Sequence, residues 1–293
     1  MNMDEVVVTA KKDNIKPNNN AAMICARSFS VEETKRFPAS ISDPGRMALS
    51  FAGVTTSNDE TNEIVIRGNA PNFLLWRIEG MEVPNPNHFS EEGYSSGAVS
   101  ILNTNMLDRS DFLTGAFPAE YGNAMSGVFD IKLRNGNAKK KEYAFQLGVM
   151  GTDLTAEGPI KKGYNGSYLI NYRYSTLGIL DKVIDFGEDF GAPIFQDLSF
   201  KINLPSGKRL VVSLWGIMGT SESNTAQSES DTLIFDDFLT SKTYMSGANY
   251  SYFFKDKSKL EAKVSFSGNS SDYIYEETNL VENIYEADSG IEL

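Results

Sequence analysis

Residues Met106–Arg134 read MLDRSDFLTGAFPAEYGNAMSGVFDIKLR, and this stretch decides the fold. Its pattern predicts two strands, Met106–Thr114 and Val128–Arg134, with an irregular crossing between them. The crossing, Gly115–Gly127, contains three glycines and Pro118, which favour bends that other residues resist. After Arg134 the sequence changes to long alternating segments, so we expect a domain boundary there.

A matching piece lies upstream in Glu63–Gly80, which reads EIVIRGNAPNFLLWRIEG. It predicts strands at Ile64–Ile66 and Phe73–Ile78, each followed by a turn that contains a glycine. Two helix starts are also predicted. Ser30 and the glutamate three residues later form a capping box, and Asp43 precedes a proline. These elements together predict a small α+β domain over residues 21–135.

From Glu142 onwards apolar and polar residues alternate with period two. The alternation is clearest in Tyr143–Val149, Tyr168–Tyr174, Leu198–Leu204, Ala248–Phe254 and Leu260–Phe266. Such segments are typical of a half-buried antiparallel sheet. A soluble β-sandwich shows the same alternation, so the pattern alone leaves both architectures open.

The predicted connections between these strands alternate in length. Short ones fall at Pro159–Asn165, Pro205–Gly207 and Lys255–Ser258, and long ones at Thr176–Ile194 and Thr220–Ser241. Membrane barrels show this asymmetry, with short turns on one side and long loops on the other. The long loops and residues 268–293 carry net charges of −3, −5 and −7, which favour solvated loops or, alternatively, divalent cation binding through carboxylates.

Composition excludes several classes of protein. The formal net charge of −12 argues against a nucleic-acid partner. No apolar run approaches the ~18–20 residues of a membrane-spanning helix. A single cysteine, Cys25, allows no intrachain disulfide, and a single histidine, His88, allows no His-rich metal site. We find no catalytic motif, and we predict no enzyme activity, no metal site and no cofactor.

Three segments in order, IVIRG, LLWRIEGMEVPNP and GAFPAEYGNAMSGVFDIKL, resemble the plug domain of TonB-dependent outer-membrane receptors. The resemblance covers about Asp4–Arg134, and NPNHF and FPAEYGNAMSG look most like Bacteroidetes members. One departure is Thr114-Gly115-Ala116, where many members have Arg-Gly-Pro. In those members the arginine supports a charge pairing between plug and barrel, and this chain lacks that arginine at this position.

The resemblance implies an α+β plug domain followed by antiparallel strands of an incomplete transmembrane β-barrel. Residues 1–20 are then a TonB box and flexible linker, 21–135 the plug, and 136–293 the N-terminal part of a truncated barrel. Because the plug enters from the periplasm, Lys141–Gly158 should hold two short strands that bend near Gly148–Asp153. The fragment then has about seven strands of a barrel of about 22. Met1–Lys12 lacks a signal peptide, and we expect the chain to be a piece of a longer one.

Several residues take roles from the resemblance. The TonB box is Glu5, Val6, Val7, Val8, Thr9 and Ala10, which would pair with TonB by strand addition; an ordinary first strand is the alternative. Arg67 is expected to be buried and to lock the plug to the barrel wall, or else to form a salt bridge within the plug. Candidate ligand contacts are Asn69, Asn72, Trp76, Asn85, Asn87, His88, Phe89 and Tyr94.

The implied function is energised uptake of a scarce ligand, such as a siderophore, vitamin, glycan or peptide, across the cell outer membrane. The implied partners are TonB in the periplasm, outer-membrane lipid and an unidentified small ligand. A lipoprotein lid, as in glycan importers of the same bacteria, is a further partner that the resemblance allows. Two alternatives stay open: a non-transporting surface adhesin or glycan-binding β protein, and a soluble enzyme with a β-rich domain.

Overall fold

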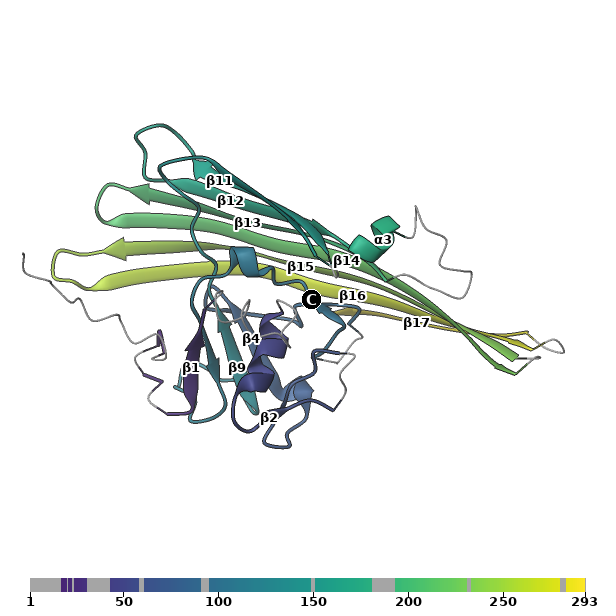
Figure 1. The fold of residues 1–293 in the computed structure, drawn as a ribbon. Coiled ribbons are helices and arrows are strands. Elements are labelled where there is room, and N and C mark those ends of the chain that lie inside the picture. The colour runs from purple at the N-terminus through teal and green to yellow at the C-terminus, as the bar shows by residue number, and fades with distance from the viewer. Residues whose placement is uncertain are drawn as a thin grey trace, which may run out of the picture.

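The computed structural model describes residues 17–19, 21–22, 24–30, 43–57, 61–90, 95–148, 151–180, 193–230, 233–279 and 283–292. It contains two layers: a small domain, which we call the plug (residues 17–134), lies against one face of a large sheet, which we call the wall (Figure 1). The predicted TonB box Glu5–Ala10, the ligand candidate Tyr94 and most of the Ser30 capping box lie outside the described residues.

A five-stranded sheet forms the centre of the plug. In spatial order its strands are β1 (Ala26–Phe29), β8 (Ser110–Leu113), β9 (Gly127–Ile131), β4 (Leu74–Ile78) and β5 (Met81–Val83). The two strands predicted from the deciding stretch are therefore present as neighbours, although β8 begins four residues later than predicted because residues Thr104–Met106 form a 3-10 turn, η4. Strands β4 and β9 are parallel, and the other pairs are antiparallel.

Short elements complete the plug. They are α2 (Pro44–Met47), η2 (Ala48–Ser50), β2 (Val54–Thr55), β3 (Val65–Ile66), η3 (Pro71–Phe73), β6 (Asn87–His88) and β7 (Val99–Ser100). The predicted helix start is confirmed, because the Asp43 carboxylate accepts hydrogen bonds from the backbone N–H groups of Gly45 (2.7 Å) and Arg46 (3.4 Å). Aromatic rings fill the core: Trp76 stacks on Phe129 with centroids 4.5 Å apart.

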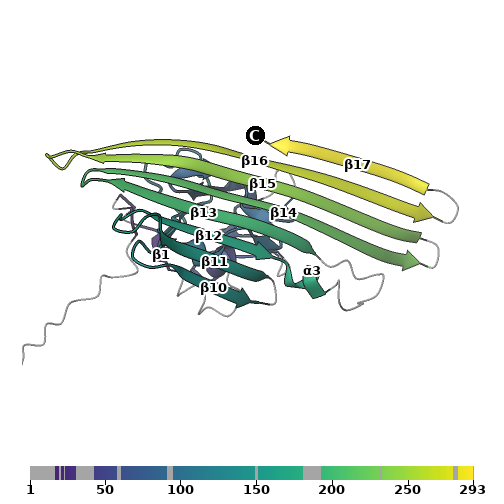
Figure 2. The same ribbon diagram turned by 90° about the horizontal axis from the view of Figure 1, so that it is seen from above.

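The wall is an eight-stranded antiparallel sheet in sequence order (Figure 2). Its strands are β10 (Glu142–Leu147), β11 (Thr152–Pro159), β12 (Ser167–Tyr174), β13 (Ile194–Ser206), β14 (Leu210–Ser230), β15 (Leu233–Phe253), β16 (Lys259–Asn279) and β17 (Asn283–Glu292), with α3 (Thr176–Leu180) after β12. The two short strands predicted before Pro159 are confirmed as β10 and β11. In the described residues β10 and β17 do not pair with each other, so this sheet is open.

Two predictions about the wall are wrong. The segment Thr220–Ser241 is not a loop, because β14 and β15 continue as a paired ladder as far as Ser230 and Leu233. The wall also has eight strands rather than about seven, since β17 forms within the acidic segment after Gly268. Both segments are rich in polar residues and read as loops. Two polar strands can nevertheless satisfy each other's backbone hydrogen bonds beyond the apolar part of a sheet.

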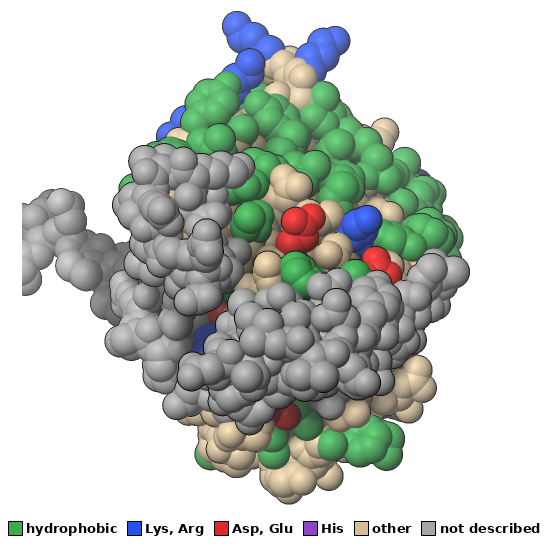
Figure 3. Space-filling view, turned by 90° about the vertical axis from the view of Figure 1, so that its right-hand side faces the viewer, with side chains coloured by type: hydrophobic (Ala, Val, Ile, Leu, Met, Phe, Trp, Pro, Cys, Tyr) green, Lys and Arg blue, Asp and Glu red, His purple; other side chains and the backbone are tan. Residues whose placement is uncertain are grey.

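The two faces of the wall differ, as the alternation predicts. One row across the sheet, Leu154, Tyr172, Leu198 and Met218, lies on the face away from the plug. Leu154 and Met218 are 56% and 43% exposed, and hydrophobic side chains cover this face (Figure 3). The next row, Asp153, Arg173 and Asp197, faces the plug and is buried or nearly so. In the described part of the chain no helix is long and apolar enough to span a bilayer.

Candidate functional site

The plug meets the wall at the ends of two parallel strands. Because β4 and β9 run in the same direction, both end on the same side of the plug, and this side faces the wall (Figure 1). β4 continues into β5 through the two-residue turn Glu79-Gly80, with Ile78 paired to Met81. Both turn residues have positive φ, +54° and +80°, as type I′ hairpin turns require. A glutamate costs about 1–3 kcal/mol in that backbone conformation, so neighbouring contacts must hold it.

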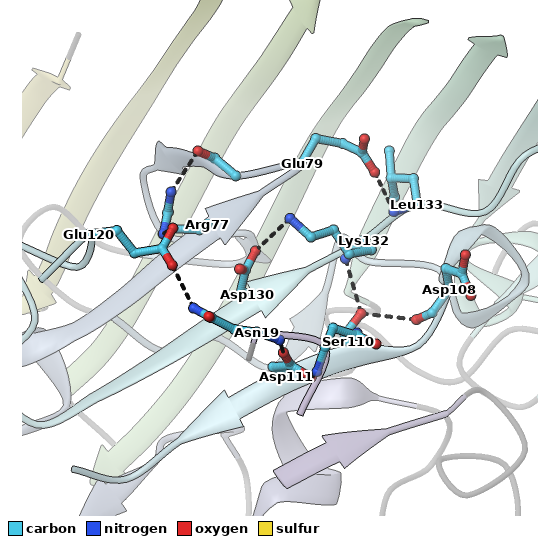
Figure 4. A network of polar contacts seen from close by, with 12 residues as sticks. Asn19, Arg77, Glu79, Asp108, Ser110, Asp111, Glu120, Asp130, Lys132 and Leu133 are labelled. Atoms are coloured by element: carbon cyan, nitrogen blue, oxygen red, sulfur yellow. Dashed lines mark hydrogen bonds and ion pairs between the residues drawn. The ribbon is translucent and has the colours of Figure 1, made fainter. Parts of the chain in front are cut away.

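The first set of contacts to the wall gathers on the carboxylate of Glu79. Its Oε1 accepts hydrogen bonds from Lys201 Nζ of β13 (3.0 Å) and from the backbone N–H of Leu133 (2.7 Å). Its Oε2 accepts one from Asn249 Nδ2 of β15 (3.2 Å), and Lys201 also donates to the Leu133 carbonyl (2.6 Å). The Glu79 and Lys201 side chains are only 9% and 8% exposed. We call these four residues the Glu79 anchor; Figure 4 shows its plug half.

A second buried group centres on Asp197 of β13. Its Oδ2 accepts from Arg173 Nε of β12 (2.7 Å) and lies 3.1 Å from His88 Nε2 of the plug. Arg173 also donates to the carbonyl of Ser100 in the plug (2.5 Å). The Asp197 side chain is fully buried, so its charge is balanced locally by the guanidinium. We call these four residues the Asp197 anchor.

Three further contacts join the plug to the wall. Asn105 donates to Asp153 of β11 (3.0 Å), and the backbone N–H of Phe89 donates to the Ser221 hydroxyl of β14 (2.9 Å). Arg134, where the chain leaves the plug, makes a two-fold pair with Glu157 of β11 at 2.9 and 2.8 Å. The plug is therefore held by charge-assisted hydrogen bonds along β11 to β15 rather than by apolar packing alone.

Burial sets the protonation of His88. The ring is 1% exposed, lies 4.8 Å from the Phe195 ring, and loses hydration that would stabilise a cation. This desolvation lowers the pKa of His88 below its usual 6.5; the neighbouring Asp197 opposes the shift and Arg173 adds to it. His88 is therefore neutral at pH 7, with its Nε2–H donated to Asp197.

This shift predicts acid sensitivity. Since the pKa of His88 is lower in the folded than in the unfolded protein, the unfolded state takes up the proton first. The stabilising contribution of neutral His88 is complete above pH 6.5 and is lost as the pH falls towards the folded pKa. His88→Gln is expected to flatten the dependence of the unfolding midpoint on pH below 6.5. Because His88 is the sole histidine, an unchanged slope in that variant would contradict this assignment.

A third group of contacts holds the segment that follows the predicted TonB box. The Asp111 carboxylate of β8 accepts from the backbone N–H groups of Asn18 (2.9 Å) and Asn19 (3.0 Å) and from the Ser28 hydroxyl (2.5 Å). We call residues 17–19 the tether. The chain then enters β1, which is an edge strand of the plug sheet.

The structure corrects the expectation for Arg67. This residue is exposed rather than buried, with a φ of +52°, because β3 ends in a turn with Gly68 at its surface. Among the described residues its guanidinium contacts Cys25 Sγ at 3.5 Å, within the plug. Among the described residues the polar plug-to-wall contacts come from the two anchors and from Asn105, Phe89 and Arg134 instead.

The ligand candidates do not form one surface. Asn69 and Asn72 are exposed, whereas Asn85 and Phe89 are half-buried. Trp76, Asn87 and His88 are at most 3% exposed and contact the plug core or the wall. The expectation that these three meet a ligand is not supported by their placement. They were chosen because aromatic and amide side chains suit binding, and the same chemistry suits buried hydrogen bonding, as in Trp76 Nε1 with Ser95 Oγ (3.3 Å).

Apart from His88, which the sequence suggested as a ligand contact, the residues of the two anchors were not predicted from the sequence. Glu79 lies in the turn that the sequence predicts after Phe73–Ile78, and the sequence analysis gave it no role. The wall sequence did contain a signal. Arg173 of β12 and Asp197 and Lys201 of β13 are charged residues at the plug-facing positions of strands in which apolar and polar residues alternate. A charge at such a position needs a partner.

Comparison with known proteins agrees with this architecture. Residues 27–128 match the family described as TonB-dependent Receptor Plug Domain, and this range covers most of the domain that packs on the wall. The search of curated proteins gave no match.

Solved structures that share the fold of plug and wall together include the following two. One is the outer membrane transporter YddB from Escherichia coli, with a TM-score of 0.56, 13% identity, and coverage of 90% of this chain and 42% of that one. The other is the siderophore receptor PirA from Acinetobacter baumannii, with a TM-score of 0.51, 13% identity, and coverage of 87% and 45%. The chain spans less than half the length of both structures, and its plug and wall strands match part of their fold.

Proposed function

We propose that this chain acts as the plug and first wall strands of a TonB-dependent outer-membrane transporter that takes up a scarce small ligand. The observation that carries the proposal is a plug domain docked through buried ion pairs on the polar face of an antiparallel sheet whose other face is apolar. An apolar outer face suits lipid, and charged contacts inside suit a plug that must later move.

The position of the tether supports a mechanism in which TonB pulls on the N-terminal end of the plug. TonB would pair with residues Glu5–Ala10 by strand addition, using main-chain hydrogen bonds. A pull there reaches the Asp111 contacts first and then β1, which has one strand neighbour, β8, among the described residues. Edge strands separate one hydrogen-bonded pair at a time, so this end of the plug yields before the centre. The inner-membrane proton gradient would supply the free energy, and the chain then needs no catalytic group of its own.

We propose only the class of the ligand, which is a siderophore, vitamin, glycan or peptide. Of the sequence candidates, Asn69 and Asn72 are exposed, although the Asn69 side-chain amide already donates a hydrogen bond to the Ile66 carbonyl (2.9 Å). PirA is a siderophore receptor, which favours iron chelates as the first compounds to screen.

The test is binding of an immobilised peptide of residues 1–12 to the periplasmic domain of the host's TonB. We expect the wild-type peptide to bind, and Val7→Pro to bind at least about tenfold more weakly because proline removes a backbone donor. Val7→Ala is the matched control, since it shortens the side chain and keeps the N–H. Equal binding by the proline and alanine peptides, or no binding by the wild type, would contradict the proposal.

A further inference from the structure

The two asparagines of the tether differ in what their side chains contact. Both donate backbone N–H groups to Asp111, but the side chain of Asn18 donates to the Arg109 carbonyl (2.7 Å). The side chain of Asn19 instead donates to Glu120 Oε1 (2.5 Å) and to the Tyr121 hydroxyl (3.1 Å). Only Asn19 therefore reaches across the plug surface towards the ends of β4 and β9 (Figure 4).

Glu120, which accepts from Asn19, also contacts Arg77 of β4. The other carboxylate oxygen of Glu120 lies 3.6 Å from Arg77 Nη1, an ion pair longer than a hydrogen bond. Arg77 also stacks over the Tyr121 ring at 4.7 Å, and its side chain is 11% exposed. Its Nε has no hydrogen-bond partner among the described residues, and Glu120 is the carboxylate there that lies within 4 Å of this mostly buried guanidinium.

Arg77 in turn holds the turn that carries the Glu79 anchor. Its Nη2 donates to the carbonyl of Gly80 (2.8 Å), the second residue of the turn in which Glu79 is the first. Because both residues have positive φ, the turn depends on its neighbours to keep this shape. The Gly80 carbonyl and the Glu79 side chain lie on either side of the peptide unit that joins these two residues, so a change in the shape of the turn moves both.

A second branch leaves Asn19 through Tyr121. The Tyr121 hydroxyl donates to Asp130 Oδ2 of β9 (3.1 Å), and Asp130 Oδ1 pairs with Lys132 Nζ (3.1 Å). Burial raises the pKa of Tyr121 to about 12, so the hydroxyl keeps its proton and stays a donor at neutral pH. This branch ends next to Leu133, whose N–H donates to Glu79.

We propose that Asn19, Glu120 and Arg77 form a polar relay that couples the tether to the Glu79 anchor, so that displacing the tether loosens the plug from the wall. Glu120 and Arg77 are then positioning residues, since they act through the turn and touch neither ligand nor TonB. Once Asn19 leaves, Glu120 loses its donor and, being 53% exposed, turns towards water. Arg77 then loses its counter-charge, and its hold on Gly80 weakens. The proposal rests on the proposed function, because TonB supplies the displacement.

The test needs no TonB and uses the intact protein in detergent. Amide hydrogen exchange is measured at Leu133 and at Glu79. The N–H of Leu133 donates to the Glu79 carboxylate, and the N–H of Glu79 donates to the Ile131 carbonyl (2.9 Å). Asn19→Ala is expected to raise both exchange rates about threefold or more. Asn18→Ala is the matched control: it removes a side-chain hydrogen bond from the same tether but not from the relay, and both rates should stay unchanged.

Glu120→Gln provides the second variant. It keeps the shape of the side chain and an acceptor for Asn19, and removes the charge that faces Arg77. We expect it to raise the two rates by itself and to reduce the further effect of Asn19→Ala, because the two variants share the path through Arg77 and only the branch through Tyr121 is left for Asn19 to act on. Equal effects of the two asparagine variants, no effect of either, or additive effects of Asn19→Ala and Glu120→Gln would each overturn the relay. Since TonB binding to residues 1–12 is measured separately, failure of the relay and failure of the proposed function give different results.

Discussion

Lys201→Ala is expected to lower the free energy of unfolding of the plug by about 3–5 kcal/mol, as removing one partner of a buried ion pair usually does. The change leaves the Glu79 carboxylate in an interface where it is 9% exposed, and removes the donor to the Leu133 carbonyl. The Glu79 carboxylate, which lies in a strained turn, then keeps two of its three hydrogen-bond donors, the Leu133 N–H and the Asn249 side chain.

Urea unfolding followed by Trp76 fluorescence measures this loss, in a Trp215→Phe background that leaves Trp76 as the only tryptophan. Lys140→Ala is the control, because the Lys140 pair with Glu142 is exposed, with side chains 71% and 40% accessible, and should leave the midpoint unchanged. The double variant Glu79→Gln with Lys201→Met should lose less stability than Lys201→Ala alone, since no unpaired charge remains. If the Lys201→Ala and Lys140→Ala proteins unfold at the same urea concentration, the Glu79 anchor has no stabilising role.

Asp197→Ala is expected to cost about 3 kcal/mol, because it strips the buried Arg173 guanidinium and His88 of their shared acceptor. Thermal unfolding compared with Asp256→Ala measures the effect, since Asp256 lies in the exposed turn after β15 and its removal should not shift the midpoint. Arg173→Ala should cost much less in the Asp197→Ala background than in the wild type. Additive losses would mean that Arg173 and Asp197 do not work as a pair.

The deciding stretch Met106–Arg134 predicted two strands and an irregular crossing, and the structure contains them as β8, β9 and the segment between. The prediction succeeded because glycine and proline positions restrict a chain locally. The division of Lys141–Gly158 into β10 and β11 was also predicted, because the family resemblance places the plug on the side of the short turns and this requires an even number of strands before Pro159. Both inferences use neighbours in sequence.

The anchors could not be predicted in the same way. Glu79 and Lys201 are 122 residues apart, and alternation shows only that Lys201 faces inward, without showing which plug residue stands opposite. Arg67 was chosen because it ends an apolar strand, but the left-handed turn after β3 places its side chain on the surface. Such pairings are set by how the two layers dock. A charged residue at an inward strand position is the one sequence signal that would have pointed to them.

The central claim is that a pull on residues 5–10 moves the plug away from the wall, and thiol labelling in cells tests it most directly. Ser90 is fully buried beside the wall contact of Phe89, and its hydroxyl has no hydrogen-bond partner among the described residues, so Ser90→Cys is a mild probe. The exposed Cys25 is first replaced by serine. The account predicts labelling of Cys at position 90 in energised cells, and its loss when Val7→Pro is added or the proton gradient is collapsed. Labelling that is the same in all three conditions would contradict it.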